Sequence, residues 1–304
     1  MRKTKTTLNE QEQQINSLTG EGKLRLSRRA VLKGFTAGGF AVAANPVLSQ
    51  VITTSAAGLD EGRVLVNVGD DDMFAYRARP LHKKNPPVIL VVPEIFGVHA
   101  YIEDVCRRLA QAGFYAMAPE IFFRHSEPGQ YATVAAILEN VISKMDDAQV
   151  MKDLDRCVEH AVGEGGDAGR LAVTGFCWGG RITWLYAAHN PAVKAGVAWY
   201  GRLVGNTTAL TPKHPVDIAG ELKAPVLGLY GAEDSGIPLG TVEQMRAALA
   251  TAAGRNPNAA ASSIAVFENA QHGFHADYRN TYNSTAAKQA YNQALAFFRG
   301  KNIL

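Results

Sequence analysis

The chain has 304 residues and a formal net charge of +3, and its apolar and charged fractions of 47% and 19% are those of an ordinary globular protein. The positive excess is confined to residues 1–58, which hold eight basic and three acidic side chains, against 23 and 25 in the remainder. The body is therefore nearly neutral, which argues against nucleic-acid binding. No run of eighteen or more apolar residues is free of polar breaks, so no membrane span is expected in the mature form.

The N-terminal segment resembles an export signal. Arg28 and Arg29 precede a weakly apolar stretch, residues 34–48, that is rich in glycine and alanine. Paired arginines, a modest apolar region and small residues suited to cleavage are the layout of a twin-arginine signal. Alanines at 43–44 and near 57 are alternative cleavage sites. The other interpretation is an amphipathic helix with a chance arginine pair.

This leader sets the expected domain organisation. Residues 1–58 are predicted to be a signal peptide and linker, and residues 59–304 a single folded domain without internal repeats. The expected partner of the leader is the twin-arginine export machinery. The folded domain would then act in the periplasm or outside the cell.

After the leader, strand patterns alternate with helical patterns. Residues Arg63–Val68 and Met73–Arg79 alternate in polarity and predict an antiparallel hairpin at a sheet edge. Short apolar runs then predict buried strands at Val88–Val92, Phe114–Ala118, Leu171–Thr174, Ala195–Trp199, Val226–Tyr230 and Ser263–Phe267. Helical spacing covers Glu103–Ala112, Tyr131–Val162 with a break near Met145, Leu239–Ala253 and Ser284–Phe298. This order predicts an α/β protein with a doubly wound, mostly parallel sheet flanked by helices.

One strand ends in a motif typical of a nucleophile. Gly175-Phe176-Cys177-Trp178-Gly179 stands between a strand and a helical pattern, which is the context of the Gly-x-Ser-x-Gly elbow. The glycines remove side chains that would collide in so tight a turn. A thiol replaces the hydroxyl, and the N-terminus of the following helix favours its thiolate form. The alternative is a free cysteine that packs as a small apolar residue.

Two later strands are followed by groups that could complete a catalytic triad. Glu233 and Asp234 follow one strand, and His272 follows the next. The order Cys177, Asp234, His272 is the nucleophile–acid–histidine order of α/β-hydrolases. His272 could accept the thiol proton while a carboxylate orients the imidazole. We favour Asp234 as the acid over Glu233 because it lies one residue further from the strand.

The loop after Val88–Val92 supplies further candidates. An oxyanion hole in this fold uses one N–H from the residue after the nucleophile and one from the loop after an earlier strand. These positions are Trp178 and Ile95. Glu94 precedes Ile95 and is predicted to come close to Cys177, where a buried carboxylate would raise the pKa of both groups unless it accepts the thiol proton itself. Its alternative role is a pair with a structural arginine.

Six motifs together carry a family resemblance. They are Pro93-Glu94-Ile95-Phe96-Gly97, Ala118-Pro119-Glu120-Ile121-Phe122-Phe123-Arg124, Gly175-Phe176-Cys177-Trp178-Gly179-Gly180, Tyr200-Gly201, Gly231-Ala232-Glu233-Asp234 and Gln271-His272-Gly273-Phe274. In this combination, the body from about 61 to 300 resembles the dienelactone hydrolase family. The resemblance implies an α/β-hydrolase fold, carboxymethylenebutenolidase-like hydrolysis, and a triad at Cys177, Asp234 and His272.

The same resemblance implies two further roles. Glu94 would be the carboxylate that interacts with the nucleophile, shifted by substrate so that it activates the thiol. Arg124 matches the arginine that holds a substrate carboxylate, and its alternative is a surface cation. A second arginine of the family, shortly after the histidine, finds Ala276 here. Tyr278 and Arg279 follow closely, and the sequence does not decide whether they substitute for it.

We therefore expect a cysteine hydrolase that cleaves a small ester or lactone through a thioester acyl-enzyme. No cofactor or metal is predicted, since the three cysteines match no metal-ligand or disulfide pattern. One alternative is a non-catalytic binding protein that retains the fold. Another is a thiol redox protein, which normally has a resolving cysteine. Cys106 and Cys157 lie in helical patterns and are expected to face the core instead.

Overall fold

The computed structural model describes residues 52–304. The predicted twin-arginine pair, Arg28 and Arg29, lies outside the described residues. The part of the predicted linker that is described lies against the folded domain. There, the backbone N–H of Thr54 donates to Asp104 at 2.5 Å and the Thr54 hydroxyl contacts the same carboxylate at 3.2 Å.

The described residues form one eight-stranded sheet in the order β1-β2-β4-β3-β5-β6-β7-β8. Its strands are β1 (Leu59–Asn67), β2 (Asp72–Pro80), β3 (Pro87–Val92), β4 (Tyr115–Pro119), β5 (Asp167–Phe176), β6 (Val193–Trp199), β7 (Val226–Gly231) and β8 (Ser263–Phe267). Strand β2 is antiparallel to both β1 and β4, and all other neighbours are parallel. The predicted edge hairpin and mostly parallel sheet are therefore confirmed.

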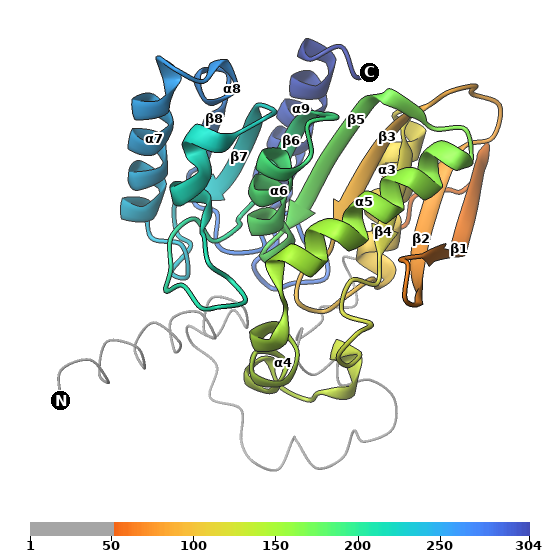
Figure 1. Ribbon diagram of the computed structural model, residues 1–304, viewed down its shortest axis with the longest axis horizontal. Helices are drawn as coiled ribbons and strands as arrows, with labels where there is room; N and C mark the ends of the chain where they lie inside the picture. Colours follow the sequence, from red (N-terminus) through yellow and green to blue (C-terminus); the bar gives the residue numbers. More distant parts are fainter. Residues whose placement is uncertain (1–51) are drawn as a thin grey trace.

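Helices cover both faces of the sheet, as the doubly wound prediction requires. The principal helices are α3 (Ala100–Gln111), α5 (Asp147–Gly163), α6 (Trp178–His189), α7 (Leu239–Ala253) and α9 (Ser284–Gly300). The chain steps along the sheet in one direction from β3 to β4, and in the opposite direction from β5 to β8. Because the crossovers are right-handed, α5, α6 and α7 lie on one face of the sheet, and α3 and α9 lie on the other (Figure 1). Strands β3, β4 and β7 are buried along their whole length and form the centre of the core.

The long helical pattern of 131–162 is broken where the sequence predicted. It divides into α4 (Val134–Asn140), the short 3₁₀ turn η3 (Ile142–Lys144) and α5. Asp146 caps α5 by accepting the Ala148 N–H at 3.0 Å, which explains why a new helix starts there. Helix α4 stands beyond the carboxyl ends of the strands, away from the sheet (Figure 1).

The remaining short elements were not predicted. They are the 3₁₀ segments η2 (Pro128–Gln130) and η4 (Pro215–Glu221) and the single-turn helix α8 (Pro257–Ala260). Cys106 and Cys157 are fully buried in helices α3 and α5, as expected for core residues. In the described region, no helix combines the length and the apolar character needed to cross a bilayer.

Candidate active site

Cys177 occupies a strained turn between β5 and α6. Its backbone has φ 56° and ψ −114°, in the left-handed region that non-glycine residues rarely adopt. A Cβ on Gly175 would lie 2.2 Å from the Gly179 carbonyl oxygen, and one on Gly179 would lie 2.2 Å from that of Val92. Only glycine fits at these two positions, so the motif is a steric requirement of the turn. The Cys177 N–H donates to the Trp199 carbonyl at 3.0 Å, which anchors the strained residue to β6.

A histidine–aspartate pair comes from the loops after β7 and β8. Nδ1 of His272 lies 2.7 Å from Oδ2 of Asp234, and both side chains are buried. The other oxygen of Asp234 accepts the N–H groups of Gly236 and Ile237 at 2.9 and 3.1 Å. The carboxylate is thereby fixed so that it orients the imidazole. Glu233, the rival acid, is exposed.

The electrostatics of this pair favour a protonated imidazole. Burial alone would lower the pKa of His272, but the negative charges of Asp234 and Cys177 outweigh it and raise that pKa to about 10. The Nε2 atom is buried and lacks a partner at strict hydrogen-bond geometry, but it lies close enough to Cys177 for a hydrogen bond from that side chain to help raise the pKa of His272.

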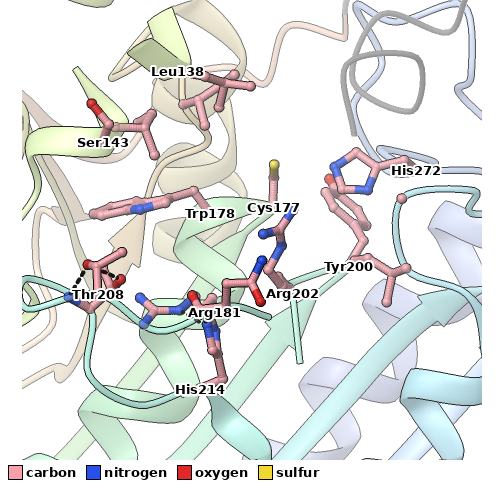
Figure 2. Close-up of a pocket in the computed structure, with 16 residues that line it drawn as sticks. Leu138, Ser143, Cys177, Trp178, Arg181, Tyr200, Arg202, Thr208, His214 and His272 are labelled. Atoms are coloured by element: carbon pink, nitrogen blue, oxygen red, sulfur yellow. Dashed lines mark hydrogen bonds between the residues drawn. The ribbon is translucent and has the colours of Figure 1, made fainter. Parts of the chain in front are cut away.

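Cys177 and His272 line one cavity of about 360 Å³. Figure 2 shows Cys177 between the indole of Trp178 and the ring of His272. Apolar side chains from α4, η3 and the loop after β7 line part of the wall: Leu138, Ile142 and Ile237. The volume suits a small organic molecule with some apolar character.

Both predicted oxyanion-hole residues, Ile95 and Trp178, line this cavity. Trp178 is the first residue of α6, so its N–H has no acceptor in the helix. Within the described part of the chain, no hydrogen bond occupies the N–H of either residue. Both groups can therefore donate to an oxygen in the cavity.

Glu94 is buried and paired with two residues that follow His272. The Tyr278 hydroxyl donates to its Oε2 atom, and Nη2 of Arg279 lies 3.3 Å from Oε1. Tyr278 and Arg279 are also buried, and Arg279 Nε lies 3.3 Å from the Tyr278 oxygen. Both residues therefore bind the Glu94 carboxylate, and whether either of them also contacts substrate stays open.

The structure does not bring Arg124 to this cavity. Its Nε and Nη2 donate to Asp153 at 3.0 and 2.9 Å, and Nη1 and Nη2 donate to Asp70 at 2.9 Å. The guanidinium also stacks over Phe123, 4.7 Å from the ring centroid. Two acidic side chains thus occupy its donors, and this placement gives no support to the expectation that Arg124 holds a substrate carboxylate, which stays a prediction.

Two arginines that the sequence analysis did not select line the cavity instead. Arg181 lies in the first turn of α6, and Arg202 lies just beyond the end of β6. Their positions in the sequence could have predicted this placement, since groups that follow the carboxyl ends of parallel strands gather at one edge of the sheet. Arg202 follows Tyr200-Gly201, which had been noted only as part of the family resemblance. Within residues 52–304, no group of three or more His, Cys, Asp or Glu side chains could hold a metal ion.

The sheet order, the elbow and the surrounding loops define the α/β-hydrolase fold. The chain belongs to the dienelactone hydrolase family, whose model matches residues 73–301, and it is accordingly a hydrolase.

Individual relatives agree with this assignment. The chain is 52% identical over 276 residues to a candidate carboxymethylenebutenolidase of Methylorubrum extorquens, with 90% of this chain and 93% of the relative covered. A candidate 2-oxo-3-(5-oxofuran-2-ylidene)propanoate lactonase of a Bradyrhizobium species is 30% identical, with 77% and 92% covered. The crystal structure of a candidate dienelactone hydrolase from Klebsiella pneumoniae matches with a TM-score of 0.77 at 50% identity, covering 79% of this chain and 98% of that one.

Proposed function

We propose that the protein cleaves an ester or lactone through a triad of Cys177, His272 and Asp234, with a thioester acyl-enzyme as intermediate. The observation that carries the proposal is the placement of a strained cysteine and an aspartate-bound histidine on one cavity. The name of the Bradyrhizobium relative, which denotes a lactonase, supports the substrate class.

In the acylation step, the Cys177 sulfur attacks the substrate carbonyl carbon. The N–H groups of Ile95 and Trp178 donate to the oxygen that becomes negatively charged. The imidazolium of His272 gives its Nε2 proton to the leaving alkoxide, and the C–O bond breaks as the thioester remains. A raised His272 pKa suits this step because the proton is already on the imidazole at neutral pH.

In the deacylation step, neutral His272 takes a proton from a water molecule that attacks the thioester carbonyl. The same two N–H groups hold the second oxyanion. The C–S bond then breaks, the carboxylic acid leaves, and the thiolate and imidazolium are restored. Asp234 keeps Nδ1 protonated throughout, so that Nε2 faces the reaction.

We also propose that Glu94 influences the nucleophile. Its complete burial and its place one residue before Ile95 support this role, since a negative charge in a buried site acts strongly on neighbouring groups. The contacts with Tyr278 and Arg279 fix the position of this carboxylate. In Glu94→Gln, we expect slower alkylation of Cys177 by iodoacetamide. An unchanged alkylation rate would remove Glu94 from this role.

The hydrolase proposal is tested with the purified protein and a panel of nitrophenyl esters and unsaturated lactones. Wild type should turn over at least one compound, and Cys177→Ala should keep less than about a tenth of that turnover while its thermal unfolding stays nearly unchanged. Cys177→Ser should keep only weak activity, because a hydroxyl is far less acidic than a thiol. Turnover by Cys177→Ala at the wild-type rate would reject the proposed nucleophile.

We further propose that residues 1–58 direct export through the twin-arginine route, so that the enzyme acts in the periplasm or outside the cell. The support is the sequence around Arg28 and Arg29. Changing both to lysine preserves the charge, and we expect this form to stay in the cytoplasm. Equal export of the double-lysine form and wild type, measured by cell fractionation, would contradict the proposal.

A further inference from the structure

The chain has two alternative sites at which its leader could be removed. A leader is cut after a small residue that has another small residue two positions before it. Ala41-Val42-Ala43, with Ala44 beside it, meets this rule, and Ser55-Ala56-Ala57 meets it as well. Ala43 and Ala44 lie outside the described residues. The choice therefore depends on how the folded domain holds the second site.

Residues 52–57, which we call the clasp, are bound to helix α3. The N–H and the hydroxyl of Thr54 donate to the Asp104 carboxylate at 2.5 and 3.2 Å. Arg107 and Arg108 of the same helix donate to it as well, at 3.4 and 2.6 Å, and Asp104 is only 1% exposed. The acceptor is thus fixed and buried, and withdrawing the Thr54 donors from it would cost the folded chain stability.

The backbone carbonyls of the second cleavage site already have donors. Nε2 of Gln111 donates to the carbonyls of Ser55 and Ala57, both at 3.1 Å. The Ala56 carbonyl accepts the Leu59 N–H at 2.9 Å. Every carbonyl from 55 to 57 is therefore hydrogen-bonded within the folded domain.

The chain that follows the second site is also fixed. Strand β1 begins at Leu59, two residues after Ala57, and pairs with β2 along its whole length. The carbonyl of Gly58, between them, accepts the Leu81 N–H at 2.9 Å. A peptidase that cuts after Ala57 would thus have to bind residues that are held by the clasp on one side and by the sheet on the other.

The clasp is continuous with the residues that support Glu94. Arg108 donates to Asp104 and to Asp277, both at 2.6 Å. Burial raises the pKa of Asp277, and Arg108 and the N–H of Ile52 act against this rise by stabilising the charged form. Asp277 directly precedes the two residues that bind Glu94. Loss of the clasp would therefore take donors from two buried carboxylates.

We propose that the leader is removed after Ala43 or Ala44 and that the mature enzyme keeps the clasp. A peptidase binds its substrate in extended form and directs hydrogen-bond donors at the carbonyl before the cut. In twin-arginine export, the chain folds before it crosses the membrane, so the carbonyls of the second site are occupied when the peptidase meets them. This inference rests on the proposed export route, because only a chain that is already folded protects the second site.

The N-terminus of the exported protein tests the proposal. The full chain is produced in a bacterium that has the twin-arginine pathway, and the periplasmic protein is analysed by intact mass and by its N-terminal peptide. We expect a chain that begins at Ala44 or Asn45. A chain that begins at Gly58 or within the clasp, or an exported chain that keeps its leader, would overturn the proposal.

A second measurement does not depend on export. The purified full chain and a synthetic peptide of residues 50–61 are treated with elastase, which cuts after small residues. The new N-termini at Ala57 and Gly58 are followed by mass spectrometry. Cutting at these two bonds should be slower in the folded chain than in the peptide by about tenfold or more, because the clasp must open first.

A double variant and a matched control show whether the clasp contacts give this protection. Thr54→Ala with Gln111→Ala removes three of the hydrogen bonds and keeps residue 54 small, and elastase should cut it at least threefold faster than wild type. Gln244→Ala makes the same change at an exposed position of α7 and should be cut at the wild-type rate. Cutting of wild type at the peptide's rate, or no increase in the double variant, would overturn the inference.

The two measurements separate this inference from the export proposal. If the chain stays in the cytoplasm but its clasp resists elastase, the export proposal fails and the protection of the second site stands. If the chain is exported and begins at Gly58, the export proposal stands and the retained clasp is rejected.

Discussion

Polar residues that follow the strands at the carboxyl edge of the sheet form two groups with different surroundings. After β5 and β8, Cys177 and His272 line one cavity, and Asp234, which follows β7, holds the imidazole of His272. After β3 and β4, Glu94 and Arg124 are held by oppositely charged side chains. Position at a strand end places a residue near the site, but its partners decide whether it reacts, supports the fold or stabilises a surface.

The largest effect should come from separating the histidine from its carboxylate. Asp234→Asn keeps the shape but removes the charge that orients and stabilises the imidazolium, so kcat should fall roughly 10²–10⁴-fold. Thermal unfolding serves as the control for an intact fold. A loss of less than tenfold would mean that His272 works without Asp234 and that the first group is not a triad.

The same substitution should change the pH dependence. Because the folded-state pKa of His272 is raised to about 10, the imidazolium persists at neutral pH and is lost as the pH rises through that value. We therefore expect an alkaline limb of kcat/KM near pH 10 in wild type. Asp234→Asn removes the charge that contributes most to the raised pKa of His272, so the alkaline limb of kcat/KM should move to lower pH. If the alkaline limb of kcat/KM stays at the same pH in Asp234→Asn, it reports the titration of a group other than His272.

Substitutions in the second group, which contains Glu94 and Arg124 with their charged partners, should change the free energy of unfolding. Arg279→Met leaves the Glu94 carboxylate buried without its cationic neighbour, and breaking a buried pair in this way costs about 3–5 kcal/mol of unfolding free energy. The control is the double variant Glu94→Gln with Arg279→Met, which removes both charges and should recover part of the loss. Denaturant unfolding measures both. If Arg279→Met and wild type unfold at the same denaturant concentration, the pair is not structural.

The smallest effect is expected at Arg124. Arg124→Ala removes contacts with Asp70, which is exposed, and with Asp153, which is buried but also accepts a bond from Gln149. The partly exposed guanidinium should contribute only about 1–2 kcal/mol to stability. The kcat/KM of Arg124→Ala for an anionic ester should stay within twofold of the wild-type value. A tenfold loss confined to anionic esters would restore the role implied by the family resemblance.

The sequence predicted most of the fold because its signals are local. Apolar runs marked every buried strand, and the polar residues near Met145 marked the start of α5, where Asp146 forms the helix cap. It also selected Cys177, Asp234 and His272, since each lies one to five residues after the end of a strand and the fold rule places such residues together. The short elements η2, η4 and α8 were missed because three to seven residues are too few to show a repeated apolar pattern.

The partners within the site could not be predicted in this way. Arg279 meets Glu94 across 185 positions of sequence, and Arg124 meets Asp153 across 29. Such pairs depend on how loops pack after the sheet has formed, and no local pattern encodes that packing. The place of Arg202 in the cavity lining was missed for the same reason, because it depends on the loop that Arg181 and Asp147 anchor.

The central claim is that Cys177 carries the acyl group, and direct observation of the thioester tests it most directly. The enzyme is mixed with an excess of an ester that turns over, quenched in acid within the first turnovers, and analysed by intact and peptide mass spectrometry. We expect up to one acyl group per chain, on the peptide that contains Cys177, released by hydroxylamine and absent from Cys177→Ala. Turnover with the acyl group on another residue, or turnover by Cys177→Ala at the wild-type rate, would contradict the claim.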